Sequence, residues 1–195
     1  MRFITSSLAM PRRYTYRRKY SYKPRKKWNS NWNSDDMNLN IPDISTTSAY
    51  TKAITNTQLI INPIDETTRA STCIVKVKNV KVQLCTSGIP DPSSLSVYTM
   101  QVAIVFCPEG ITPSSDILER HPEWLMAYKM LTIDASTTIP INFSISSRLA
   151  RNLNSGDTIY LTVIARRVSG ETVTQPQTGL IMPCYYTVQY WTCVN

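Results

Sequence analysis

Residues 98–106 read Tyr-Thr-Met-Gln-Val-Ala-Ile-Val-Phe, and hydrophobic side chains occupy every even-numbered position of this stretch. A period of two is typical of a β-strand with one buried face, because successive side chains point to opposite sides of the strand. The same alternation recurs over residues 139–145, 159–165 and 186–190. The pattern predicts a fold built from half-buried strands.

One further alternating stretch, residues 73–85, changes parity in its middle. Val75 and Val77 occupy odd positions, whereas the hydrophobic residues from Val80 onward occupy even positions. A β-bulge adds one residue to a strand and would restore a common facing for both halves. We therefore predict a bulge near Asn79.

Segments rich in turn-forming residues, at 87–92, 108–110 and 154–157, separate these strands. A single helical turn is predicted over residues 146–153, with Ser146 or Ser147 as its N-cap. About eight strands joined by loops of variable length favour an all-β, two-sheet sandwich, and the jelly roll is the eight-stranded member of that class.

Charge divides the chain into unequal parts. Residues 1–34 contain ten Lys and Arg side chains and no acid, whereas residues 35–195 contain 11 basic and 13 acidic side chains. Few aliphatic residues accompany the basic cluster, so we expect residues 1–34 to form a disordered arm. Residues 35–56, rich in Asn, Ser, Thr and Asp, are expected to be a linker into a jelly-roll domain of residues 57–195.

The arm interleaves basic with aromatic side chains, a combination that suits single-stranded nucleic acid. Lys and Arg neutralise phosphates, and aromatic rings stack on unpaired bases without reading a sequence. Clustered Lys and Arg also serve as nuclear import signals. The candidate nucleic-acid-binding residues are Arg12, Arg13, Tyr14, Tyr16, Arg17, Arg18, Lys19, Tyr20, Tyr22, Lys23, Arg25, Lys26, Lys27 and Trp28.

The sequence lacks the motifs typical of enzymes, metal-binding proteins and membrane proteins. It has a single histidine, His121, and no phosphate-binding glycine loop or nucleophile elbow, so we expect no enzymatic activity and no cofactor. The five cysteines contain no C-x-x-C pair, which favours buried free thiols over a metal site. No apolar run approaches the roughly 18–20 residues of a membrane helix, so we expect no membrane insertion.

Four segments carry a resemblance to a known family. They are the arm Met-Pro-Arg-Arg-Tyr-Thr-Tyr-Arg-Arg-Lys from residue 10 onward, Phe-Cys-Pro-Glu-Gly at 106–110, His-Pro-Glu-Trp-Leu-Met-Ala at 121–127, and Ser-Arg-Leu-Ala-Arg-Asn-Leu-Asn-Ser-Gly-Asp at 147–157. Together they resemble the capsid protein of circular single-stranded DNA viruses that encode a replication initiator, the circovirus-like group. The arm differs from that of many relatives in having Tyr and Lys at positions where they have Arg. Capsid chains of this family commonly start close to the basic run, so Met1 and Met10 are both candidate starts.

The resemblance implies a jelly-roll protein that assembles as 60 copies into a T=1 icosahedral shell. Its arm would bind the single-stranded DNA genome inside the virion and would engage import receptors of the host nucleus, where assembly is expected. A cell-surface receptor is implied without being identified. On the predicted helical turn, Arg148 and Arg151 would share one face and are candidate assembly contacts between copies.

Two other classes of protein would share these sequence features. A capsid protein of a small single-stranded RNA virus or a satellite virus would share both the jelly roll and the arm, since phosphate and stacking contacts do not distinguish the sugars. A single-stranded nucleic-acid-binding protein that does not assemble is the other, although such proteins usually carry basic residues on their folded surface.

Overall fold

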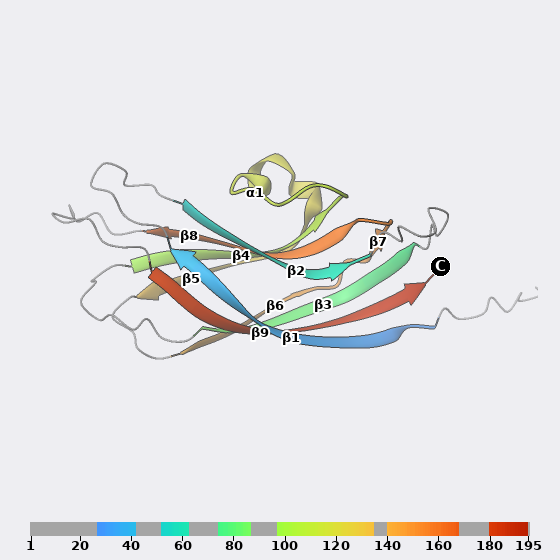
Figure 1. Ribbon diagram of the computed structural model, residues 1–195, viewed down its shortest axis with the longest axis horizontal. Helices are drawn as coiled ribbons and strands as arrows, with labels where there is room; N and C mark the ends of the chain where they lie inside the picture. Colours follow the sequence, from blue (N-terminus) through green and yellow to red (C-terminus); the bar gives the residue numbers. More distant parts are fainter. Residues whose placement is uncertain are drawn as a thin grey trace, which may run out of the picture.

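The computed structural model describes residues 27–41, 52–62, 74–86, 97–134, 140–167 and 180–194, and most of them lie in β-strands (Figure 1). The strands are β1 (Asn29–Ile41), β2 (Lys52–Ile61), β3 (Val75–Thr86), β4 (Val97–Cys107), β5 (Leu125–Asp134), β6 (Ile141–Ser147), β7 (Arg151–Leu153), β8 (Thr158–Arg167) and β9 (Leu180–Val194). Two short helices, α1 (Ile117–Arg120) and η1 (Pro122–Trp124), lie between β4 and β5. Over these ranges, no helix has the length and apolar character needed to cross a membrane.

The strands form two antiparallel sheets stacked face to face (Figure 1). One sheet has the order β1-β9-β3-β6, with β7 also pairing with β3, and the other has the order β2-β8-β4-β5. Early strands pair with late strands in a nested order: β1 pairs with β9, β2 with β8, β3 with β6, and β4 with β5. This order is that of a long hairpin folded into two sheets. With β6 and β7 counted as one interrupted strand, this is the predicted eight-stranded jelly roll.

The core lies between the sheets and uses every second residue of the strands. Met100, Val102 and Ile104 of β4 belong to the same buried cluster as Val82 of β3 and Val188 of β9. Each such side chain contributes roughly 1.5–3 kcal/mol through its burial. The even-numbered positions predicted to be buried on β4 are therefore confirmed over residues 100–104.

The second half of β4 is buried on both of its faces. Ala103, Val105 and Cys107 point away from the main core but pack against Ile117 of α1, with Trp124 of η1 partly buried beside them. Figure 1 shows α1 above the outer side of the four-stranded sheet. This covering explains why hydrophobic residues run without a break over residues 102–107.

The β-bulge predicted near Asn79 is confirmed. Lys78 pairs with Trp191 and Lys81 with Gln189, so three residues of β3 span the distance of two residues of β9. Asn79 has a φ of 52°, in the left-handed region that asparagine tolerates better than most residues. As a result, Val77 and Val80 are both fully buried.

The linker expected over residues 35–56 is wrong for residues 35–41 and 52–56, which lie in strands, while residues 42–51 lie outside the described residues. The sandwich starts before residue 57, and the expected disordered arm of residues 1–34 is wrong for residues 29–34, so the arm ends at Trp28. Strand β1 already begins at Asn29 and pairs with β9 over its whole length, and β2 begins at Lys52. Met37 and Leu39 of β1 are 6% and 2% exposed, so two hydrophobic side chains are enough to bring this polar strand to the core. Asn, Ser and Asp occupy most of its remaining positions and dominate its composition.

The helical turn predicted over residues 146–153 is also wrong. Residues up to Ser147 belong to β6, residues 148–150 form an irregular link, and residues 151–153 form β7. The Ser147 hydroxyl accepts a hydrogen bond from the Leu149 amide at 3.2 Å, but no helix follows. Leu153 is fully buried whereas Leu149 is 50% exposed, so only Leu153 anchors the segment to the core.

The left-handed backbone at Asn79 generates a prediction for stability. Replacing Asn79 with Val should lower the free energy of unfolding by about 1–2 kcal/mol, because a β-branched residue disfavours a positive φ. The matched variant Asn79→Gly should stay close to the parent, since glycine adopts this conformation freely. Urea unfolding monitored by circular dichroism measures both, and equal stability of the two variants would contradict the bulge geometry.

Candidate nucleic-acid interface

Two of the predicted nucleic-acid-binding residues, Lys27 and Trp28, lie within the described part of the chain. The others, from Arg12 to Lys26, lie outside it. Lys27 is exposed and Trp28 is half-buried. The Lys78 ammonium lies 3.8 Å from the centroid of the Trp28 ring, which is a cation–π contact. The last part of the arm is therefore attached to the folded domain through β3.

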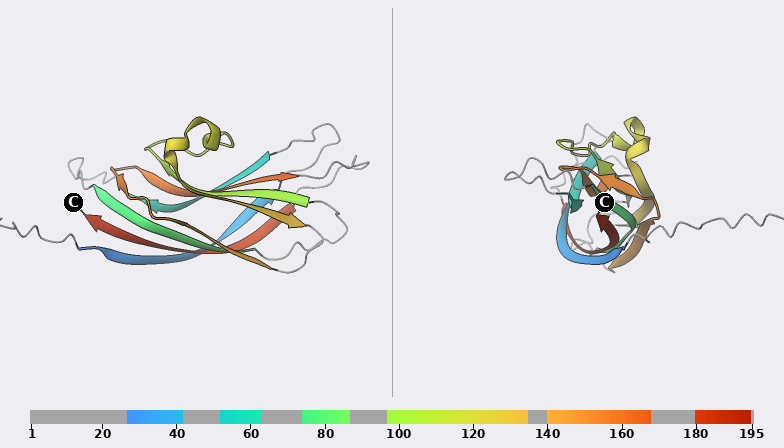
Figure 2. Two further views of the ribbon diagram at one scale, coloured as in Figure 1. Left: turned by 180° about the vertical axis from the view of Figure 1, so that it is seen from behind. Right: turned by 90° about the vertical axis from the view of Figure 1, so that its right-hand side faces the viewer.

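This attachment lies at one end of the five-stranded sheet. Trp28 directly precedes β1, whose first residue, Asn29, pairs with Thr192 near the end of β9. Lys78 pairs with Trp191 on the same strand. Figure 2 shows the start of β1, the start of β3 and the end of β9 at the same end of the sandwich. The arm therefore joins the domain beside three paired strands.

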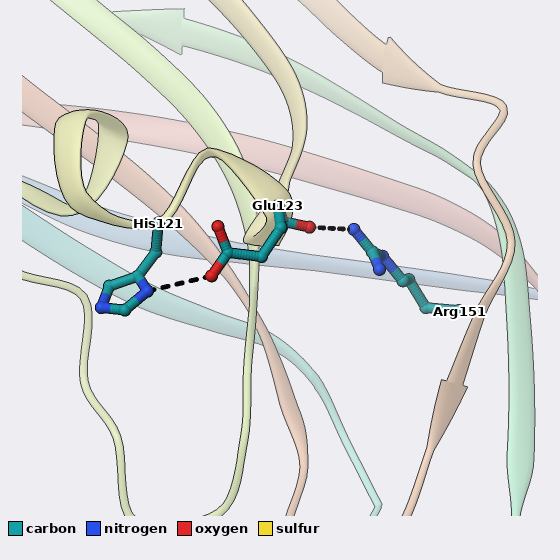
Figure 3. A network of polar contacts seen from close by, with 3 residues as sticks. All are labelled: His121, Glu123 and Arg151. Atoms are coloured by element: carbon teal, nitrogen blue, oxygen red, sulfur yellow. Dashed lines mark hydrogen bonds and ion pairs between the residues drawn. The ribbon is translucent and has the colours of Figure 1, made fainter.

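Three of the four segments that carry the family resemblance meet in space through Arg151. Its guanidinium carbon lies 5.6 Å from the centroid of the Phe106 ring. The same guanidinium donates a hydrogen bond to the carbonyl oxygen of Glu123, as Figure 3 shows. One side chain of β7 thus connects the end of β4 with the short helix η1.

A second link joins the turn after β4 to the turn before β8. The buried Asp157 carboxylate accepts hydrogen bonds from the Glu109 amide, at 3.3 Å from Oδ1, and from the Asn154 amide, at 2.8 Å from Oδ2. Gly156 has a φ of +85°, and a Cβ there would come within 2.5 Å of the Glu109 side chain. These motifs therefore stabilise one corner of the sandwich, which is a structural role.

His121 lies between α1 and η1. Its Nδ1 is 3.0 Å from Oε1 of Glu123 (Figure 3). Its ring also stacks on Trp124, with 4.0 Å between the ring centroids. A hydrogen bond from its own backbone, followed by the one to His121, lowers the pKa of the Glu123 carboxyl below its ordinary value. Glu123 therefore stays ionised at neutral pH and holds His121 in place.

The expectation that Arg148 and Arg151 share one helical face is corrected by the strand geometry. Arg148 is exposed in the link between β6 and β7. Arg151 is partly buried, with its guanidinium directed toward Phe106 and Glu123 of its own chain. The two side chains therefore have different surroundings, and only Arg148 is exposed enough to contact another copy of the chain.

Among the cysteines of the described strands, Cys85, Cys107 and Cys184 are free thiols. Cys107 and Cys184 are buried, Cys193 is buried, and Cys85 is half-exposed; Cys73 lies outside the described residues. Burial raises the pKa of Cys107 to about 11. Burial, with a smaller contribution from Cys85, raises the pKa of Cys184 to about 12. Within the described ranges, no group of three or more His, Cys, Asp or Glu side chains could hold a metal ion.

Neither a protein-family model nor a curated protein matches this sequence. The structure is similar to the decameric BFDV capsid protein, with 10% identity over 85% of this chain and 99% of that chain, and a TM-score of 0.44. It is also similar to Mud crab tombus-like virus, with 11% identity over 100% and 92% of the two chains and a TM-score of 0.48. The jelly-roll assignment rests on the strand pairing described above and not on these similarities.

The contacts of Arg151 predict that the two arginines differ in their effect on stability. Arg151→Ala should lower the free energy of unfolding by about 1 kcal/mol, because it removes a hydrogen bond from a charged donor. Arg148→Ala, its matched control, should change the free energy of unfolding by less than about 0.5 kcal/mol. Urea unfolding of the two variants measures both free energies of unfolding. A larger decrease for Arg148→Ala than for Arg151→Ala would contradict the stabilising role of Arg151.

The thiols give a prediction for chemical modification. At neutral pH, iodoacetamide should modify Cys85 well before Cys107 or Cys184, because the thiolate is the nucleophile and a raised pKa keeps these two protonated. Their protection should persist as the pH rises through 9 and end on unfolding in urea. Mass spectrometry of the digested protein measures each site. Modification of Cys107 at the rate of Cys85 in the folded protein is the contrary result.

Proposed function

We propose that this chain is the capsid protein of a small virus, that 60 copies assemble into a closed icosahedral shell, and that the arm packages a single-stranded DNA genome. The division of charge carries the proposal. Ten cationic side chains without one acid lie in residues 1–34, while the rest of the chain is close to neutral. A polyanion would bind to such an arm, and the near-neutral domain can pack against its own copies without strong repulsion.

The positive charge of the arms is large enough to neutralise many phosphates of a packaged genome. Sixty arms with ten cationic side chains each would bring about 600 positive charges into one shell, at one charge per phosphate. Tyr14, Tyr16, Tyr20 and Tyr22 add rings that stack on bases of any sequence. A sequence-tolerant contact suits a protein that has to cover a whole genome.

The folded domain is suited to self-association. Its two sheets are complete jelly-roll layers, and a closed shell requires no partner other than the chain itself. The exposed Arg148 is available for a contact between copies, where a guanidinium can bind a neighbour's carboxylate or carbonyl groups. Arg151 supports that surface indirectly by holding η1 in place.

We further propose that the basic run serves nuclear import, so that assembly takes place in the host nucleus and the mature protein resides in the virion. An RNA genome is the main alternative, and treatment of purified particles with DNase and RNase distinguishes the two. A nucleic-acid-binding protein that does not assemble would elute as a 22.2 kDa monomer in size-exclusion chromatography and show no particles in electron microscopy.

Removal of residues 1–26 tests the role of the arm without cutting into β1, which begins at Asn29. The truncated chain should fold but lose tight binding to a fluorescent oligo(dT), since most of the cationic side chains are gone. For the full chain, log affinity should fall with log salt concentration with a slope of up to about −7 if ten phosphates are neutralised. Fluorescence anisotropy at several salt concentrations measures both.

A length-matched control separates charge from chain length. This variant keeps residues 1–27 but replaces their ten Lys and Arg side chains with Gln. It should bind as weakly as the truncated chain. Tight binding by either variant at the same salt concentration would refute the proposed role of the arm.

A further inference from the structure

The bulge at Asn79 determines where the lysines of β3 point. Val77 and Val80 face the core, so Lys76, Lys78 and Lys81 face the opposite side of the five-stranded sheet. Without the extra residue, the positions after Asn79 would exchange faces, since side chains alternate along a strand. The bulge therefore keeps all three ammonium groups on the outer face of this sheet.

Tryptophans from the two neighbouring strands lie beside these lysines. Trp191 of β9 pairs with Lys78, and Trp32 of β1 pairs with Gln189, which in turn pairs with Lys81. Trp32 is 64% exposed, which is unusual for the largest hydrophobic side chain. Trp32 and Lys81 line one shallow hollow together with Gln83, Thr187 and Gln189. We call Lys76, Lys78, Lys81, Trp32 and Trp191 the Lys/Trp face.

The surroundings of the Lys/Trp face are free of acidic residues over most of the sheet. Strands β3, β6, β7 and β9 contain no Asp or Glu. The two acids of β1, Asp35 and Asp36, pair with Tyr186 and Tyr185, farther along β9 from Trp191. The half of the sheet nearest the arm therefore carries ammonium groups and indole rings without a neutralising carboxylate on these strands.

We propose that the Lys/Trp face is a second binding surface for single-stranded nucleic acid, which continues from the arm onto the sheet. This inference rests on the proposed function, because the arm delivers the strand. Lysines contact phosphates, and exposed rings on a β-sheet stack on unpaired bases. Trp28 is already covered by Lys78, so Trp32 and Trp191 provide the rings for stacking.

The position of the face favours nucleic acid over a second copy of the chain. Lys27 and Trp28, the last residues of the arm, lie at its edge, so a strand held by the arm has a high effective concentration there. If a second copy docked on the face, its carboxylates would compete with the phosphates of the nucleic acid for the same lysines. The charge of the arm and the charge of the face thus point to one ligand.

The test uses the full chain and an oligo(dT) of about twenty nucleotides, which exceeds the roughly 4–16 nucleotides covered by one sheet-based module. The variant Trp32→Ala/Lys81→Gln should bind about 5- to 100-fold more weakly, the range expected for loss of one stacked base, with a salt slope smaller by about 0.7 for the lost phosphate contact. The matched control Tyr128→Ala/Arg120→Gln removes one exposed ring and one exposed charge elsewhere, and should bind like the parent.

The outcomes separate this inference from the proposed function. If the arm truncation abolishes binding while Trp32→Ala/Lys81→Gln binds like the parent, the Lys/Trp face is refuted and the role of the arm stands. Unchanged binding with fewer closed particles would identify the face as a contact between copies, which also overturns the inference. An equal loss in the matched control would do the same. Weaker binding in the site variant alone supports it, provided that circular dichroism shows an unchanged fold.

Discussion

The β-bulge at Asn79 is the constraint on which both faces of the five-stranded sheet depend. Strand β3 pairs with β9, β6 and β7, so its facing decides the facing of the whole layer. One inserted residue lets Val77 and Val80 enter the same core while Lys78 and Lys81 share the outer face. A local change of backbone conformation thus coordinates the packing of the core with the chemistry of the surface.

The arm is connected to this arrangement at a defined point. The Trp28–Lys78 contact and the pairing of β1 with β9 fix the first described residues against the end of the sheet where the lysines of β3 begin. At the same end of the sandwich but on the other side of β3, Arg151 of β7 and Asp157 join η1 and two turns into one corner. The proposed polyanion-binding surface and the structural contacts of this corner therefore use different residues.

The jelly roll could be predicted from the sequence because period-two alternation marks strands, and the parity change even located the bulge. The start of the sandwich could not, because β1 contributes only Met37 and Leu39 to the described core and otherwise looks like a polar linker. Nor could β7, because residues 146–153 hold leucines at helical spacing, and tertiary packing selects Leu153 alone. The lysines of β3 were predictable in principle, since a bulge that aligns valines aligns the intervening lysines as well.

A cryo-electron microscopy reconstruction of particles assembled from the full chain tests this account most directly. The account predicts a closed shell with the outer face of the five-stranded sheet turned toward the lumen. Nucleic-acid density should begin near Lys27 and Trp28 and reach Trp32 and Lys81. A shell in which this face lies on the outside of the particle would contradict the account, and so would one in which it is buried against a neighbouring copy.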